Sequence, residues 1–258
     1  MTIKIWPISA FSDNYIWAIV QSEQAVVVDP GDAKPVLAYL QEFGLTLKTI
    51  LLTHHHADHV GGVPELVEKT GATVYGPAGP TIPCRNVTLK EGDHVNLDSL
   101  GQFSVLEVPG HTLDHIAYFG QVDGRNVLFC GDTLFATGCG RLFEGNSRQM
   151  QQSLDKFKKM PHNTSVYCAH EYTLSNIRWA RTVDPHNPDL EQWQREAETL
   201  RNNNQATVPT SLEHELKTNP FMRTDEPVVI TAAEQNAGRS LDHPENVLEV
   251  LREWKNHF

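Results

Sequence analysis

The stretch that most constrains this chain runs from Thr53 to Gly62, directly after an apolar segment. It places four side chains able to bind a metal within six residues: His54, His56, Asp58 and His59. His54 and His56 alternate in an extended segment and can point to the same side, whereas Asp58 and His59 lie where the chain turns into a helix. One strand end can therefore serve two metal ions.

Three further residues are not expected to bind the metal themselves. His55 faces away from His54 and His56, because adjacent side chains of an extended segment point to opposite sides. Asp29 ends another apolar strand, so it either orients a ligand or forms the turn before Pro30. His115 either supports a ligand or belongs to the core.

Three later strands end in the same kind of residue. The apolar segments 103–108, 126–130 and 165–168 are followed by His111, Asp132 and His170, respectively. Functional groups of α/β proteins gather beyond the carboxyl ends of strands, because the strand is rigid and the loop after it is free to vary. The sequence therefore predicts seven ligands at one edge: His54, His56, Asp58, His59, His111, Asp132 and His170.

Seven ligands exceed the four of a closed zinc site but suit two divalent ions that share one ligand. Only a carboxylate bridges comfortably, so Asp132 is predicted to lie between the ions. One ion is assigned His54, His56 and His111, and the other Asp58, His59 and His170. Asp132, Asp58 and His54 are predicted to act in catalysis. We expect zinc, and this nitrogen and oxygen ligand set also accepts iron or manganese according to supply.

The chain divides by its pattern into a mixed β/α domain, residues 1–173, and a small all-helical domain, residues 174–258. Helical windows replace strands in the second part, at 174–182, 188–202, 211–217, 231–236 and 244–257. Two capping boxes are predicted there, Thr210 with Glu213 and Thr231 with Glu234. The predicted fold class is α/β with a helical C-terminal domain.

Composition restricts the partners. The formal net charge is −11, from 21 Lys plus Arg against 32 Asp plus Glu, and such a surface disfavours nucleic acid. No apolar run is long enough to span a bilayer and the N-terminus lacks the layout of a signal peptide, so we expect no membrane contact and a cytoplasmic location. We also expect a monomer. The four cysteines have no regular spacing, which predicts buried thiols: Cys84, Cys130, Cys139 and Cys168.

The motif THxHxDHxGG at 53–62, with GHT at 110–112, GDT at 131–133 and HE at 170–171, resembles the metallo-β-lactamase superfamily. The resemblance implies an αββα sandwich with a metal site at one edge. Within the superfamily the chain is similar to the glyoxalase II family over nearly its whole length. The segments specific to that family are 11–17, 139–145, 169–173 and 219–223.

The glyoxalase II resemblance implies the residues that hold glutathione. They are a basic and an aromatic residue after the CG pair, a tyrosine after HE, and two basic residues of the last helix: Arg141, Phe143, Tyr172, Arg252 and Lys255. Arg141 replaces the frequent Lys, which keeps the charge but changes the donor geometry. Phe143 replaces the frequent Tyr and so lacks its hydroxyl.

The implied activity is hydrolysis of a small glutathione thioester, S-D-lactoylglutathione, to D-lactate and glutathione by hydroxide held at two metal ions, in methylglyoxal detoxification. The alternative is a mononuclear-iron persulfide dioxygenase acting on glutathione persulfide, which shares the HxHxDH region but lacks the long helical tail. A tRNA-processing nuclease is disfavoured by the acidic charge. A class B β-lactamase usually has Cys where Asp132 stands.

Overall fold

The strands near the start of the chain build one edge of a six-stranded sheet. In this computed structural model, which describes residues 2–79 and 81–258, the sheet order is β1-β2-β3-β4-β5-β6. Strands β1 to β3 pair antiparallel and β3 to β6 parallel. Their bounds are Lys4–Ala10, Asn14–Gln21, Gln24–Val28, Thr46–Leu51, Thr73–Pro77 and Val87–Leu89.

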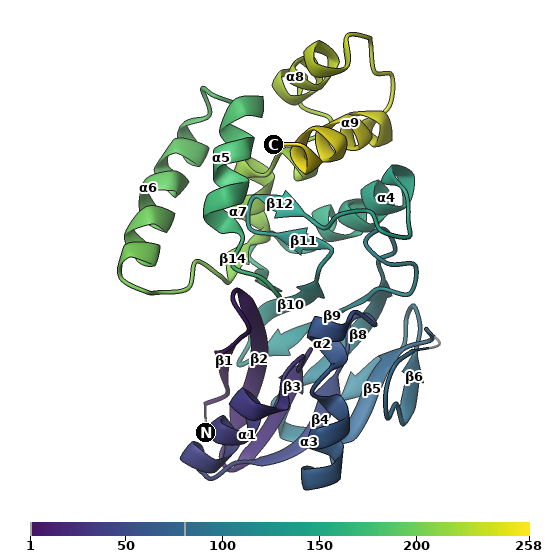
Figure 1. Cartoon of the computed structure of the whole chain (residues 1–258), viewed down its shortest axis with the longest axis vertical. Helices are drawn as coiled ribbons and strands as arrows, with labels where there is room; N and C mark the ends of the chain where they lie inside the picture. The colour runs from purple at the N-terminus through teal and green to yellow at the C-terminus, as the bar shows by residue number, and fades with distance from the viewer. Residues whose placement is uncertain (1, 80) are drawn as a thin grey trace. The chain divides into compact units, whose positions relative to one another are not determined.

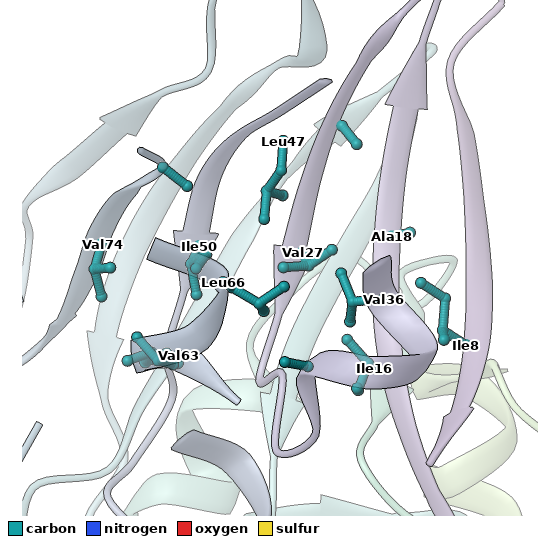
Figure 2. Packing of buried hydrophobic residues seen from close by; sticks show 14 of the residues in the cluster. Ile8, Ile16, Ala18, Val27, Val36, Leu47, Ile50, Val63, Leu66 and Val74 are labelled. Carbon is teal, nitrogen blue, oxygen red and sulfur yellow. The ribbon is translucent and has the colours of Figure 1, made fainter. Parts of the chain in front are cut away.

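Two helices cover one face of this sheet, as Figure 2 shows. Helix α1 (Ala33–Phe43) contributes Val36, and α3 (Val63–Thr70) contributes Val63 and Leu66 to a buried cluster with sheet residues such as Val27 and Ile50. Each fully buried side chain of this kind stabilises the fold by about 1.5–3 kcal/mol. The packing fixes the carboxyl ends of β3 and β4. The short helix α2 (Ala57–Val60) follows β4 after a loop.

Contacts along the chain divide it into two units. The first extends to Glu107 and also contains Asp114–Gly131; the second contains Val108–Leu113 and Asp132–Phe258. Besides the six-stranded sheet, the first unit has four antiparallel strands in the order β10-β9-β8-β7. Their bounds are Arg125–Gly131, Ile116–Val122, Gln102–Glu107 and His94–Asn96, with the 3₁₀ turn η1 at Asp98–Leu100.

The second unit is mainly helical (Figure 1). It also holds the pair β13–β14 and a separate two-stranded sheet, β11–β12. The strands are β11 Leu134–Phe135, β12 Gly138–Cys139, β13 Ser165–Cys168 and β14 Thr210–Ser211. The helical elements are α4 Ser147–Lys158, α5 Thr173–Val183, α6 Pro188–Asn202, α7 Leu212–Thr218, η2 Pro220–Met222, α8 Pro227–Ala237 and α9 Pro244–Asn256. Every helical window predicted after residue 173 is confirmed.

Both predicted capping boxes are wrong. The residue that caps α7 is Ser211, whose side chain accepts from the backbone N–H of His214, because Thr210 belongs to β14. The pair at 231 and 234 lies inside α8, which begins one turn earlier at Pro227. Proline suits the first helical turn, where its missing N–H costs nothing.

The cysteine prediction holds in part. Cys130, Cys139 and Cys168 are buried, whereas Cys84 is exposed in the loop between β5 and β6, so the prediction of a buried thiol is wrong there. Burial raises the pKa of Cys168 to about 12, which keeps it a thiol at neutral pH. Across residues 2–79 and 81–258, no helix has the length and apolar character needed to cross a membrane.

Candidate metal centre and substrate-binding residues

In the first unit, the loop after β4 is anchored by the carboxylate of Asp29. Asp29 Oδ1 accepts from the backbone N–H of Thr53 at 2.8 Å, and Oδ2 accepts from Thr53 Oγ1 at 2.7 Å. Oδ2 also lies 3.1 Å from Nδ1 of His59. Asp29 is only 4% exposed, so it orients a predicted ligand from inside the protein.

The predicted ligands of this unit lie in two pairs. His54 Nε2 is 3.2 Å from His56 Nδ1, and His59 Nε2 is 3.5 Å from Asp58 Oδ2. Two ligand atoms of one tetrahedral zinc ion lie about 3.3 Å apart, because zinc–nitrogen distances are ~2.0–2.1 Å. Each pair therefore has the spacing of two ligands on one ion.

Neighbouring groups fix which ring nitrogen each histidine offers. Nδ1 of His54 lies 3.0 Å from Thr53 Oγ1, and Nδ1 of His59 faces Asp29, so both rings turn Nε2 toward the second member of their pair. His115 is fully buried and its ring stacks on His54, with centroids 4.6 Å apart. His115 thus belongs to the core and packs against a predicted ligand.

The glycines around this loop stand where a larger residue would clash with the backbone. A Cβ on Gly31 would lie 1.8 Å from the carbonyl oxygen of Asp58, and one on Gly62 would lie 2.6 Å from the carbonyl oxygen of Pro30. The loops after β3 and β4 therefore pack backbone against backbone. Gly31 and Gly62 permit this approach.

Two further side chains, those of Asp114 and Asn14, contact the loop. His55 Nδ1 lies 2.9 Å from Asp114 Oδ1, so His55 points toward another partner, as its position in an extended segment predicts. Asn14 Nδ2 donates to Asp58 Oδ2 at 3.0 Å. Asn14 lies in the glyoxalase II-like segment 11–17, and no local pattern marks it as a partner of Asp58.

In the second unit, the carboxylate of Asp132 lies between two histidines. Its Oδ2 is 3.4 Å from His111 Nε2, and its Oδ1 is 3.4 Å from His170 Nε2. All three residues are at least 94% buried. Each oxygen faces a different imidazole at the spacing of two ligands on one ion, which is the geometry a bridging carboxylate requires.

The segment after Asp132 also contacts His111. His111 Nδ1 is 2.8 Å from the carbonyl oxygen of Arg141, which turns Nε2 toward Asp132. A Cβ on Gly140 would lie 2.1 Å from the carbonyl oxygen of Asp132 and 3.0 Å from His111 Nδ1. Only glycine fits where these two segments meet.

Aromatic side chains surround the histidines of this unit. The ring of Tyr172 stacks on His170 with centroids 4.7 Å apart and an interplanar angle of 3°. Phe143 meets His111 edge to face at 5.3 Å and is 63% exposed. Both predicted aromatic substrate residues therefore lie next to a predicted ligand and expose part of their surface.

The three predicted substrate cations differ in burial. Arg141 is exposed, whereas Arg252 is 4% exposed and its Nη1 donates to the carbonyl oxygen of Cys139 at 2.8 Å. Burial, and then the charges of Arg252 and Arg141, lower the pKa of Lys255 to about 8. Such mutual repulsion indicates cations close enough to attract one anionic ligand.

The donor set fits divalent metals. It consists of imidazole nitrogens and carboxylate oxygens, in pairs separated by 3.2–3.5 Å. Imidazole suits zinc and iron, and carboxylate oxygens suit these ions and manganese. The chain therefore carries clusters suited to divalent metal binding.

Two family models match consecutive parts of the chain. Residues 11–170 match the metallo-β-lactamase superfamily, and residues 171–258 match the hydroxyacylglutathione hydrolase C-terminus. Curated proteins named hydroxyacylglutathione hydrolase are similar over the full length. Those of Ectopseudomonas mendocina and Nitrosomonas eutropha are 52% and 50% identical, covering 99% of this chain and 100% and 99% of their own lengths.

Solved structures share the fold. The crystal structure of ETHE1 from Myxococcus xanthus has a TM-score of 0.65 and 28% identity, and the match covers 99% of this chain and 98% of that one. The fold is thus the α/β metallo-β-lactamase fold with a helical C-terminal region. The chain belongs to the hydroxyacylglutathione hydrolase family of the metallo-β-lactamase superfamily.

Proposed function

We propose that this chain is a glyoxalase II, a metal-dependent thioester hydrolase that converts S-D-lactoylglutathione to D-lactate and glutathione and so serves methylglyoxal detoxification. The observation that carries the proposal is the full-length identity of about half to curated hydroxyacylglutathione hydrolases. The C-terminal family match at 171–258 favours the hydrolase over a persulfide dioxygenase.

The metal ligands are proposed as they were predicted. His54, His56 and His111 serve one ion, Asp58, His59 and His170 the other, and Asp132 bridges. The donor spacings within each unit support this assignment. So does the structural likeness to TTHA1623, described in a di-iron-bound form, with a TM-score of 0.58 and 27% identity over 84% of this chain. We propose zinc as the usual metal.

The chemistry follows from this ligand set. When bound, two divalent ions would polarise the thioester carbonyl and make hydroxide available near neutral pH. Asp29 and Thr53 keep the imidazoles of His54 and His59 in the orientation that such a centre needs. Asp132, Asp58 and His54 are the residues we propose nearest the reacting atoms.

The substrate is proposed to bind through its peptide. The carboxylates of glutathione suit the cations Arg141, Arg252 and Lys255, and Tyr172 and Phe143 offer aromatic surface beside the thioester. The meeting of the two family matches at residues 170 and 171 supports a catalytic domain at 1–173 and a helical substrate domain at 174–258. A cytoplasmic monomer stays a prediction.

Hydrolysis of S-D-lactoylglutathione, followed by the release of thiol, tests the proposal alongside elemental analysis of the purified protein. Asp132→Ala should lose metal and turnover together, whereas Asp242→Ala, at an exposed position, should retain both. Near wild-type turnover in Asp132→Ala would refute the bridging role. Oxygen consumption with glutathione persulfide, without thioester hydrolysis, would instead establish the dioxygenase.

A further inference from the structure

A short buried hairpin, Leu134–Cys139, lies in sequence between Asp132 and the proposed substrate residues Arg141 and Phe143. Its strands β11 and β12 form a two-stranded sheet of their own. Its turn residue Thr137 is fully buried and has φ 60°. A β-branched residue rarely adopts the left-handed region and persists there only where the surroundings hold it.

Buried polar side chains hold the turn. Glu215 Oε2 accepts from the backbone N–H of Thr137 at 2.8 Å, and Trp193 Nε1 donates to Thr137 Oγ1 at 3.1 Å. Asn219 Nδ2 donates to Glu215 Oε2 at 2.9 Å and to the carbonyl oxygen of Gly138 at 2.9 Å. Glu215 and Asn219 are fully buried, so these bonds face no competition from water.

The two basic residues of α9 are hydrogen-bonded to the same hairpin, Arg252 directly and Lys255 through Asn176. Arg252 Nη1 donates to the carbonyl oxygen of Cys139 at 2.8 Å. Lys255 Nζ donates to Asn176 Oδ1 at 2.6 Å, and Asn176 Nδ2 donates to the carbonyl oxygen of Ala136 at 2.9 Å. The position of the hairpin therefore sets where both cations point.

Glu215 acts in this network as a hydrogen-bond acceptor. Burial raises its pKa, opposed by the charge of His214 and by the hydrogen bonds it accepts. Its second oxygen, Oε1, accepts from the hydroxyl of Thr210 at 2.6 Å, and a hydroxyl can also accept. A glutamine can place its carbonyl oxygen at Oε2 and its amide toward Thr210, so it preserves every hydrogen bond of the site.

We propose that Glu215 is a positioning residue for glutathione recognition. By fixing the hairpin turn, it orients Arg252 and Lys255 toward the carboxylates of the substrate peptide. Asn176 links Lys255 to the hairpin through its two hydrogen bonds. This inference rests on the proposed function. It differs from a purely structural role because it predicts a loss confined to substrates that carry the peptide.

The test compares two thioesters of one acyl group, S-lactoylglutathione and S-lactoyl-N-acetylcysteamine, which lacks the peptide. For Glu215→Ala we expect kcat/KM with the glutathione thioester to fall about 10- to 100-fold, mainly through KM, as expected for lost binding. Metal content should be unchanged, and kcat/KM for the small thioester should stay within about threefold. Glu215→Gln should match the wild type with both.

A second variant keeps the test valid if Glu215→Ala does not fold. Asn176→Ala removes the link between Lys255 and the hairpin within α5, where alanine favours the helix, and should show the same selective loss. Equal losses with both thioesters, or no loss with either, would overturn the proposal, as would a Glu215→Gln variant as impaired as Glu215→Ala.

Binding of free glutathione, followed by calorimetry in wild type and variants, separates this proposal from the function it rests on. Weaker binding in Asn176→Ala supports the positioning role even where the wild type hydrolyses no thioester, a result that would refute only the hydrolase. Unchanged binding in an active enzyme refutes the positioning role alone.

Discussion

Replacing Asp29 by asparagine removes one negative charge and one acceptor from the anchor of the histidine loop. The wild-type carboxylate accepts through both oxygens, from the backbone N–H and hydroxyl of Thr53 and from His59 Nδ1. An asparagine amide must turn its NH₂ either toward the Thr53 backbone N–H or toward His59. In the first case donor faces donor; in the second, His59 must move its proton to Nε2, the atom predicted to bind metal.

The size of the expected loss in metal affinity follows from the hydrogen bonds that the substitution removes. A hydrogen bond to a charged group contributes about 1.5–3 kcal/mol. Since 1.4 kcal/mol corresponds to a factor of ten, one such loss lowers metal affinity by about 10- to 100-fold. Because Asp29 is 4% exposed, water cannot replace the missing acceptor.

Metal affinity measured by competition with a chelator checks this prediction, with thioester turnover followed at saturating metal. Asp32→Asn is the matched control, since Asp32 lies in the same loop but caps α1, and asparagine caps a helix as well as aspartate. An Asp29→Asn protein that binds metal within about twofold of wild type would refute the orienting role.

Three further outcomes are expected. Gly140→Ala should reduce activity and metal content, because the new Cβ would lie 2.1 Å from the carbonyl oxygen of Asp132; wild-type metal content would contradict this. The pKa of Lys255, lowered to about 8, means that its ammonium deprotonates as pH rises through 8, so KM for the glutathione thioester should rise there while kcat holds; a flat profile in wild type would count against its contact with substrate. Iodoacetamide at pH 8 should modify Cys84 and spare Cys168, whose pKa is about 12, as mass spectrometry of the native protein can show.

Much of the site was predictable because its residues follow local patterns. Short apolar runs indicate the strands, and the predicted ligands follow their ends, either in loops that are free to carry polar residues or, for Asp58 and His59, in the short helix α2. The HxHxDH spacing likewise fixes two donor pairs within six residues, and the structure gives those pairs separations of 3.2 and 3.5 Å.

Helix starts were less predictable for a physical reason. Thr210 and Glu213 satisfy a capping pattern, yet Thr210 is drawn into a strand pair with β13 and donates its hydroxyl to Glu215. A capping box contributes about 0.5–2 kcal/mol, which tertiary hydrogen bonds easily exceed in sum.

The sequence by itself determined the family, the metal-binding residues proposed here and the chemistry they suit, because these depend on residue types at short spacings. Only the tertiary structure decided which side chains hold the hairpin Leu134–Cys139. Glu215 binds the Thr137 backbone from 78 positions away, and Arg252 binds that of Cys139 from 113 positions away. Such bonds join a side chain to a backbone group that nearly every residue possesses, so they leave no local signature, and only folding brings the partners together.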